Sequence, residues 1–98
     1  MSRLLQHPEA DDELQAAIHW YAIRGGRKAL RFDKKVDGVM QEIRTHPDRY
    51  PYYNSEFREA AVPIFPYSVI YRALPTGDVQ VIAVAQASRE PGYWRDRA

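Results

Sequence analysis

The first half of the chain places its apolar residues at the spacing of two amphipathic helices. The first apolar face uses positions i, i+4, i+7, i+8 and i+11: Ala10, Leu14, Ala17, Ile18 and Tyr21. The same spacing recurs further on: Phe32, Val36, Val39, Met40 and Ile43. About four loop residues around Gly25 and Gly26 join the two segments, so the pattern predicts an antiparallel helical hairpin.

Local signals mark the ends of these helices. Pro8 suits a first helical turn, and the acidic residues after it place negative charge at the positive end of the helix dipole. The second helix is expected to begin near Arg27. It should end at His46, because the residue before a proline disfavours helical backbone angles.

The second half of the chain changes to the period of strands. Strands are expected near residues 3–6, 57–62, 67–73 and 79–85, with a turn at 75–78. The last of these strands is apolar on both faces, which predicts an interior position with helices covering at least one side. Pro63 and Pro66 favour an edge or a bulge for the strand before them. The fold class is therefore α+β: one domain over residues 1–98, with an N-terminal strand and a helical hairpin packed on a mostly antiparallel, twisted sheet of three to four strands.

Composition narrows the function classes. The 98 residues include no cysteine, which excludes disulfides, thiolate metal sites and a cysteine nucleophile. The start has no apolar stretch long enough for a signal peptide, and no later stretch approaches ~18 apolar residues, so a cytoplasmic protein without membrane contact is expected. A chain this short buries only ~60–65% of its unfolded surface, which favours a stabilising partner.

The charges are segregated along the chain, although the net charge is only +1. Residues 1–23 carry one basic and four acidic side chains, a sum of −3, whereas residues 24–49 carry eight basic and four acidic ones, a sum of +4. The basic segment could attract an acidic partner. The small overall excess is not typical of a sequence-independent nucleic-acid binder.

Three arginines in the second half, Arg58, Arg72 and Arg89, are candidates for anion binding. A guanidinium matches phosphate or carboxylate oxygens with two parallel hydrogen bonds. Residue statistics alone favour the plainer interpretation, in which arginines are solvated or paired with nearby carboxylates. We retain the plainer interpretation for Arg72, beside Tyr71 in a packed strand.

An acid–base pair for RNA cleavage is hard to assemble from this sequence. Arginine stabilises charge but has a pKa above ~12, so it cannot act as a base near neutrality. Tyr93 would need a strongly altered pKa, Gln86 carries no titratable proton, and His46 ends a helix. His7 and the acidic residues after it lack the ligand spacing of a metal site, so no metal and no cofactor is expected.

The order of several short motifs resembles the RelE/ParE superfamily of type II toxin–antitoxin toxins, on its ParE-like side. These motifs are His7–Ala10, His46–Pro51, Phe65–Tyr67, Val69–Arg72, Val81–Ala85 and Pro91–Trp94, with Arg58 and Arg89 between them. The resemblance spans nearly the whole chain. It implies that Arg58 and Arg89 lie near the concave, solvent-facing side of the sheet. Gln86 departs from the histidine of many relatives, and no lysine lies in the region where the ribosome-dependent branch uses lysines.

The resemblance implies a toxin that binds and inhibits DNA gyrase, a poison rather than a catalyst. The implied target-binding residues are Arg58, Arg89, Tyr93, Trp94 and Arg95, whose guanidinium and indole groups would project outward. Trp94 is equally compatible with a lid over the sheet. The alternatives are a ribosome-dependent mRNA endonuclease, in which Arg58, Arg89 and Tyr93 act on the mRNA, and a degenerate, non-toxic interaction module.

The resemblance also implies a cognate antitoxin, an acidic and partly disordered protein that folds on contact and forms a hetero-oligomer with the toxin. The basic segment after the first helix would bind it through Arg24, Arg27, Lys28, Arg31, Lys34 and Lys35. A solvated helix face is the default interpretation of such a segment.

Overall fold

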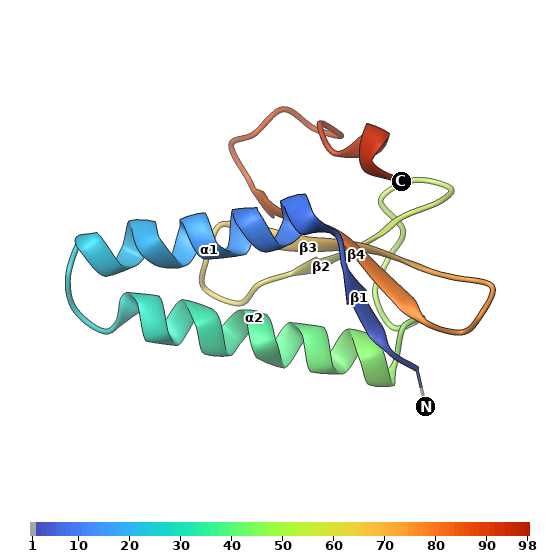
Figure 1. Cartoon of the computed structure of the whole chain (residues 1–98), viewed down its shortest axis with the longest axis horizontal. Helices are drawn as coiled ribbons and strands as arrows, with labels where there is room; N and C mark the ends of the chain where they lie inside the picture. Colours follow the sequence, from blue (N-terminus) through green and yellow to red (C-terminus); the bar gives the residue numbers. More distant parts are fainter. Residues whose placement is uncertain (1) are drawn as a thin grey trace.

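Two helices lie side by side across one face of a four-stranded sheet in the computed structural model, which describes residues 2–98 (Figure 1). The elements follow in the order β1 (Leu4–Gln6), α1 (Pro8–Ile23), α2 (Lys28–Thr45), β2 (Arg58–Ala61), β3 (Tyr67–Ala73), β4 (Val79–Gln86) and a 3₁₀ turn, η1 (Arg95–Arg97). The sheet order is β1-β4-β3-β2, with β1 parallel to β4 and the other pairs antiparallel. The α+β prediction is confirmed, including the interior position of β4 and the edge position of β2.

The two helices begin in different ways. At α1, the Nδ1 atom of His7 accepts a hydrogen bond from the backbone N–H of Glu9 at 3.1 Å, and Pro8 occupies the first turn. At α2, Arg27 makes no side-chain capping bond, and the first turn contains no acidic residue. The start of α2 therefore lacks both the side-chain cap and the negative charge that stabilise a helix N-terminus.

The main hydrophobic core lies between the helices and the sheet. The two predicted helical faces meet there, where the Tyr21 and Phe32 rings lie 5.3 Å apart between centroids. Phe65 from the β2–β3 loop packs against both rings. The buried residues of this core include Ala10, Ala17, Tyr21, Phe32, Val36, Val39, Met40, Ile43, Ala60, Val69, Tyr71, Val79, Val81 and Val84.

A second, smaller core covers the opposite face of the sheet. It consists of Phe57, Ile70, Ile82, Ala83 and Trp94. The indole of Trp94 is only 2% exposed, so the expectation that it projects outward is wrong. The helices cover one face only, and the apolar side chains on the other face need a cover, which the C-terminal segment supplies.

A bulge and a short neighbour shape β4. Ile70 pairs with Ala83 and Tyr71 pairs with Val81, which leaves Ile82 without a partner on β3. The extra residue lets two successive side chains face the second core. On the side away from β3, β4 pairs with β1 only as far as Val81. On that side the backbone from Ile82 to Gln86 has no neighbouring strand.

Within residues 2–98, neither helix is both long enough and apolar enough to cross a membrane.

Candidate interaction site

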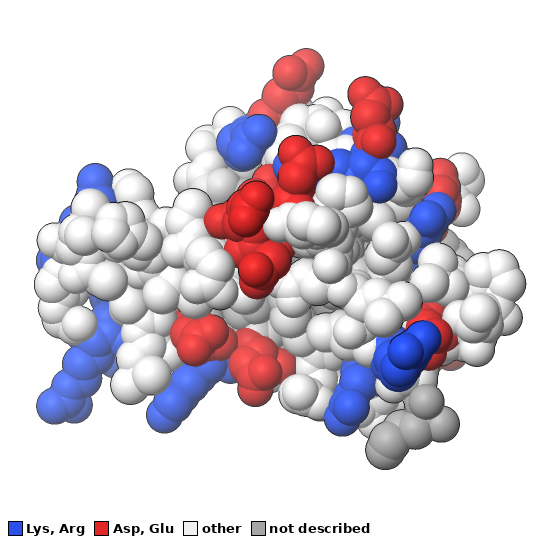
Figure 2. All heavy atoms as spheres, in the orientation of Figure 1, with Lys and Arg blue, Asp and Glu red and all other residues white. Residues whose placement is uncertain are grey.

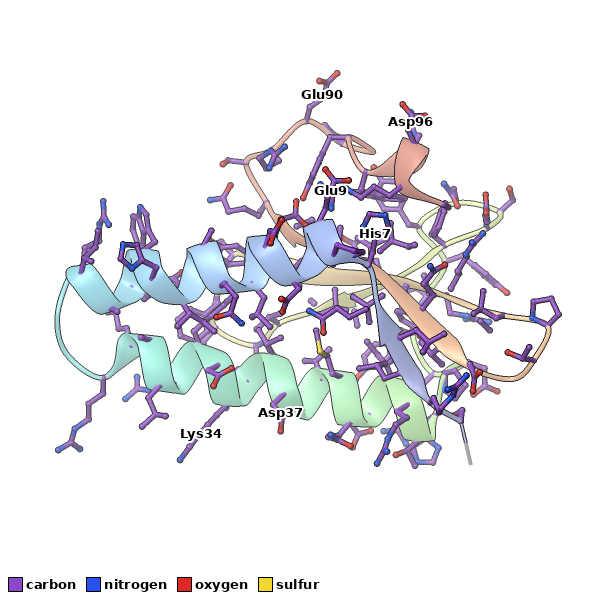
Figure 3. All side chains as sticks on the ribbon, in the orientation of Figure 1. His7, Glu9, Lys34, Asp37, Glu90 and Asp96 are labelled. Atoms are coloured by element: carbon purple, nitrogen blue, oxygen red, sulfur yellow. The ribbon has the colours of Figure 1, made fainter. Side chains whose placement is uncertain are left out.

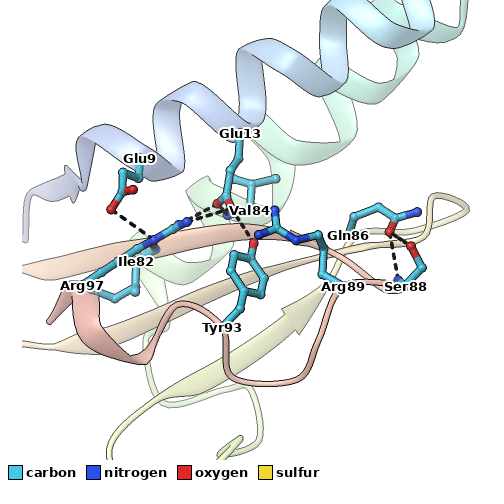
Figure 4. A network of polar contacts seen from close by, with 9 residues as sticks. All are labelled: Glu9, Glu13, Ile82, Val84, Gln86, Ser88, Arg89, Tyr93 and Arg97. Atoms are coloured by element: carbon cyan, nitrogen blue, oxygen red, sulfur yellow. Dashed lines mark hydrogen bonds and ion pairs between the residues drawn. The ribbon is translucent and has the colours of Figure 1, made fainter.

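Glu13 joins three parts of the fold at the unpaired rim of β4. Its carboxylate accepts a hydrogen bond from the backbone N–H of Val84 at 3.1 Å and two from the Arg97 guanidinium, at 2.8 and 3.1 Å. The Tyr93 hydroxyl donates a further bond to the same carboxylate. Arg97 also donates to the carbonyl oxygen of Ile82 at 3.2 Å (Figure 4). These contacts provide hydrogen-bond partners for the Val84 N–H and the Ile82 carbonyl oxygen, two backbone groups on the side of β4 that the short β1 does not reach.

Glu13 raises the pKa of both side chains that donate hydrogen bonds to it. Burial, the hydrogen bond to Glu13 and the nearby carboxylate charge raise the pKa of Tyr93 well above that of a free tyrosine. The hydrogen bond to Glu13 also raises the pKa of Arg97. Near neutrality the junction therefore holds a charged guanidinium and a neutral phenol beside Glu13. A phenol with a raised pKa is a poor general base, which weakens the nuclease role considered for Tyr93.

Arg89 is the loosely held cation of this junction. Its Nη1 atom lies 3.8 Å from Glu13 Oε2, and its guanidinium lies 3.8 Å from the centroid of the Tyr93 ring. The Arg89 side chain is 53% exposed, whereas that of Arg97 is 12% exposed. Figure 4 shows the two arginines approaching Glu13 from opposite sides. Because Arg97 already neutralises Glu13, Arg89 can bind an external anion at little cost to the junction.

A groove of about 390 Å³ runs from this junction along α1. Ala16 and Ala17 contribute small side chains to its wall, and Tyr67 and Pro66 line the opposite side. Arg89 and Tyr93 line it beside Gln86, and Trp20 lines it on α1 towards the hairpin turn. The Arg24 guanidinium lies 3.6 Å from the centroid of the Trp20 ring. The groove therefore has apolar walls, and two of its lining aromatic rings carry a stacked arginine: Arg89 on Tyr93 and Arg24 on Trp20.

Arg58 does not lie on the solvent-facing side of the sheet, so that expectation is wrong. Its register partner is Tyr71, and directly paired residues point to the same face, which here is the face that α2 covers. Burial of Ala60 fixes this parity, because side chains two positions apart share a face. The Arg58 Nη1 atom donates to the Tyr50 carbonyl oxygen at 2.6 Å, and its guanidinium lies 3.9 Å from the centroid of the Tyr52 ring.

The three residues considered for RNA cleavage do not surround one place. Arg58 lines a small cavity with Tyr52 and Arg72, whereas Arg89 and Tyr93 line the groove beside α1. The register points the same way. Arg58 pairs with Tyr71, whereas Gln86, three residues before Arg89, pairs with Tyr67, about 13 Å away along β3. Arg58 and Arg89 therefore line separate cavities rather than one phosphate site.

The remaining candidate residues of the second half differ in whether their side chains contact the rest of the chain. Arg72 pairs with Glu56 at 2.8 Å and bonds Gln80 at 3.0 Å, which confirms the plain structural interpretation. The Trp94 ring packs against Tyr53 and Phe57. Arg95 is exposed and forms no ion pair within the described part of the chain. Gln86 accepts hydrogen bonds from the backbone N–H and the hydroxyl of Ser88.

The six basic residues proposed for antitoxin binding are all exposed, at or after the hairpin turn. Figure 2 shows Lys and Arg over this end of the molecule, with acidic side chains nearer the middle, and Figure 3 shows Lys34 pointing away from the fold. No Asp or Glu occurs between residues 14 and 32. Three large apolar side chains lie exposed in the same stretch, a feature the sequence pattern did not indicate: Trp20, Ile23 and Leu30.

The metal interpretation of His7 gains no support from the structure. Its ring nitrogen serves as the cap of α1, and the described residues contain no group of three His, Asp or Glu side chains placed to hold a metal ion. Glu13, by contrast, belongs to the acidic run that the helix dipole favours, and the sequence offers no specific role for it. It follows Ala10 by three residues and precedes Ala17 by four, which places it beside the apolar face, and this position is the available signal for a buried role.

Comparison with solved structures supports the fold. The chain is similar to one in the "Chromosomal ParDE TA system from P. aeruginosa", with a TM-score of 0.76 and 17% identity, covering 90% of this chain and 98% of that chain. No curated protein matches the chain. The fold is thus of the RelE/ParE-like α+β type. Residues 4–91 match the family model described as "ParE toxin of type II toxin-antitoxin system, parDE". The chain belongs to this ParE toxin family.

Proposed function

We propose that this ParE-family toxin inhibits DNA gyrase by direct binding in the cytoplasm and is neutralised by a cognate antitoxin. The match to the ParE family over residues 4–91 carries the proposal. The separation of Arg58 from Arg89 and Tyr93 supports a binding mechanism over RNA cleavage, because Arg89 and Tyr93 line the groove while Arg58 lines a different cavity.

The proposed target surface is the exposed part of the C-terminal segment. Arg89 and Arg95 present guanidiniums to solvent, and Tyr93 holds Arg89 in place through ring stacking. Arg58 and Trp94 support this surface from within rather than by contact, since Arg58 ties down the preceding loop and Trp94 is buried. Exposed guanidiniums suit carboxylates on a protein target.

The proposed antitoxin surface is the basic hairpin together with the groove along α1. The groove offers apolar walls, and the adjoining hairpin offers a run of cations, with no Asp or Glu between residues 14 and 32. An acidic segment with apolar side chains would match both features when it folds on contact. The solved relative carries the name of a ParDE system, which accords with a paired antitoxin for this chain.

The experiment is expression of the chain without antitoxin, followed by a supercoiling assay with purified gyrase. We expect growth arrest and loss of supercoiling, both relieved by co-expression of the acidic protein encoded beside the toxin. Growth arrest with intact supercoiling and cleaved mRNA on translating ribosomes would overturn the proposal in favour of the endonuclease alternative. Soluble expression without growth arrest would instead indicate a non-toxic interaction module.

A further inference from the structure

Ile64 combines two unfavourable features in the β2–β3 loop. Its φ angle is +60°, in the left-handed region, where a β-branched side chain is strained. It is the one non-glycine residue with positive φ among the described residues. Its side chain is also 72% exposed, more than any other large hydrophobic residue that the structure describes as exposed.

Contacts on both sides of Ile64 impose this conformation. Val62 is buried, and its backbone N–H donates to the Tyr67 carbonyl oxygen at 2.9 Å. Phe65 packs its ring 5.2 Å from Tyr21 and 5.1 Å from Phe32. The loop is thus fixed to the core at each end while Ile64 points away from it. Strain of this kind persists only where the surroundings over-determine it, and it concentrates at functional sites.

We propose that Ile64 is an apolar anchor for the antitoxin, inserted into the apolar face of its acidic segment. This inference rests on the proposed function. Residues 60–71 contain no charged side chain, whereas the start of α2, which Phe65 touches through Phe32, carries Lys28, Arg31 and Lys35. An uncharged knob beside a basic helix complements a segment that alternates apolar and acidic residues.

The test separates strain from contact with three variants. Ile64→Asn removes the anchor and suits left-handed backbone, Ile64→Leu keeps an apolar side chain, and Ile23→Asn makes the same polar change on a helix. We expect Ile64→Asn to raise the Tm of the free toxin by about 4 °C, because relief of strain stabilises the fold. We expect it also to weaken binding of the purified antitoxin about 10- to 100-fold, the loss typical of one buried aliphatic side chain. Ile64→Leu should bind within about threefold of the unchanged chain, and Ile23→Asn should not raise the Tm.

Each other outcome counts against the proposal. A lower Tm for Ile64→Asn would show that Ile64 packs within its own chain. A higher Tm with unchanged antitoxin affinity would remove the anchor role. Unchanged antitoxin affinity with weaker gyrase inhibition would assign the loop to the target instead. If the wild-type toxin binds no antitoxin, the proposed function itself is refuted. The Tm of Ile64→Asn then still reports on backbone strain at Ile64, so the two failures can be distinguished.

Discussion

The guanidinium of Arg97 donates two hydrogen bonds to the carboxylate of Glu13, 84 residues earlier in the chain. This contact fastens the C-terminal segment to α1, while Glu13 also accepts from the Val84 N–H and Arg97 also donates to the Ile82 carbonyl oxygen. It also holds Tyr93, and through Tyr93 the half-exposed Arg89. The proposed target surface thus depends on Glu13, whose side chain is largely buried.

Removal of the Glu13 carboxylate should loosen the C-terminal segment. We expect Glu13→Ala to lower the free energy of unfolding by about 1.5–3 kcal/mol, because charged hydrogen bonds to Arg97 and a bond to Val84 are lost together. Urea unfolding measures the change. A Trp20→Phe background leaves Trp94 as the reporter, whose emission should shift to the red in the variant. An unchanged spectrum would mean that the apolar contacts of Trp94 hold the segment without Glu13.

Arg58 and Arg89 should separate structural from target-binding effects. Arg89→Ala is expected to relieve gyrase inhibition at least tenfold while the Tm stays within about 2 °C, because its side chain is exposed. Arg58→Ala is expected to lower the free energy of unfolding by about 1–2 kcal/mol, because the Tyr50 carbonyl oxygen loses its donor. Equal losses of stability in both variants would argue against this division. The Arg31→Ala variant, exposed and outside the proposed target surface, serves as the comparison for surface truncation.

Alkaline pH should destabilise the fold through its tyrosines. Burial raises the pKa of Tyr71 to about 12, and burial with the bond to Glu13 raises that of Tyr93 further. In the unfolded chain both titrate near 10, so their contribution to stability is complete below pH 10 and is lost as the pH rises through the folded values. Urea unfolding at pH 8 and pH 11 should show the lower stability at pH 11. Tyr71→Phe and Tyr93→Phe should each reduce this difference, and an undiminished difference in the double variant would exclude these residues as its source.

The uncapped start of α2 should reveal a conflict between stability and binding. Lys28→Glu places a negative charge in the first turn, and we expect it to raise the free energy of unfolding by about 0.3–1 kcal/mol. The same change should weaken antitoxin binding, because it reverses a charge of the proposed basic surface. Lys35→Glu, two turns into the helix, should weaken binding without the stability gain. Stronger antitoxin binding by either variant would contradict the assignment of this surface.

Periodicity predicted the architecture because most of the core is amphipathic at a regular spacing. The faces that contain Ala17 and Val36 are buried, and β4 lies inside the sheet as its apolar run indicated. The burial of Trp94 could not be predicted. The pattern of β3 and β4 indicated a second apolar face of the sheet, but it did not indicate which segment covers that face. The side of the sheet that Arg58 faces required the register between β2 and β3, which no local signal specifies.

The junction of Glu13 and Arg97 was out of reach for a different reason. The position of Glu13 beside the apolar face indicates burial but names no partner, and Arg97 follows the last recognisable motif. Their pairing depends on the bulge at Ile82 and on the early end of β1, both of which are tertiary features. Side chains that complete a neighbour's backbone bonding leave little trace in sequence spacing.

The rim of β4 beyond Val81 also bears on self-association. Strands with open N–H and C=O groups template pairing with other molecules, and most proteins close them with backbone or shield them with charge. Here Glu13 and Arg97 occupy the Val84 N–H and the Ile82 carbonyl oxygen, so their loss would open these groups to other copies of the chain. Variants at Glu13 or Arg97 are therefore expected to form intermolecular β-structure and precipitate well before the helical layer unfolds.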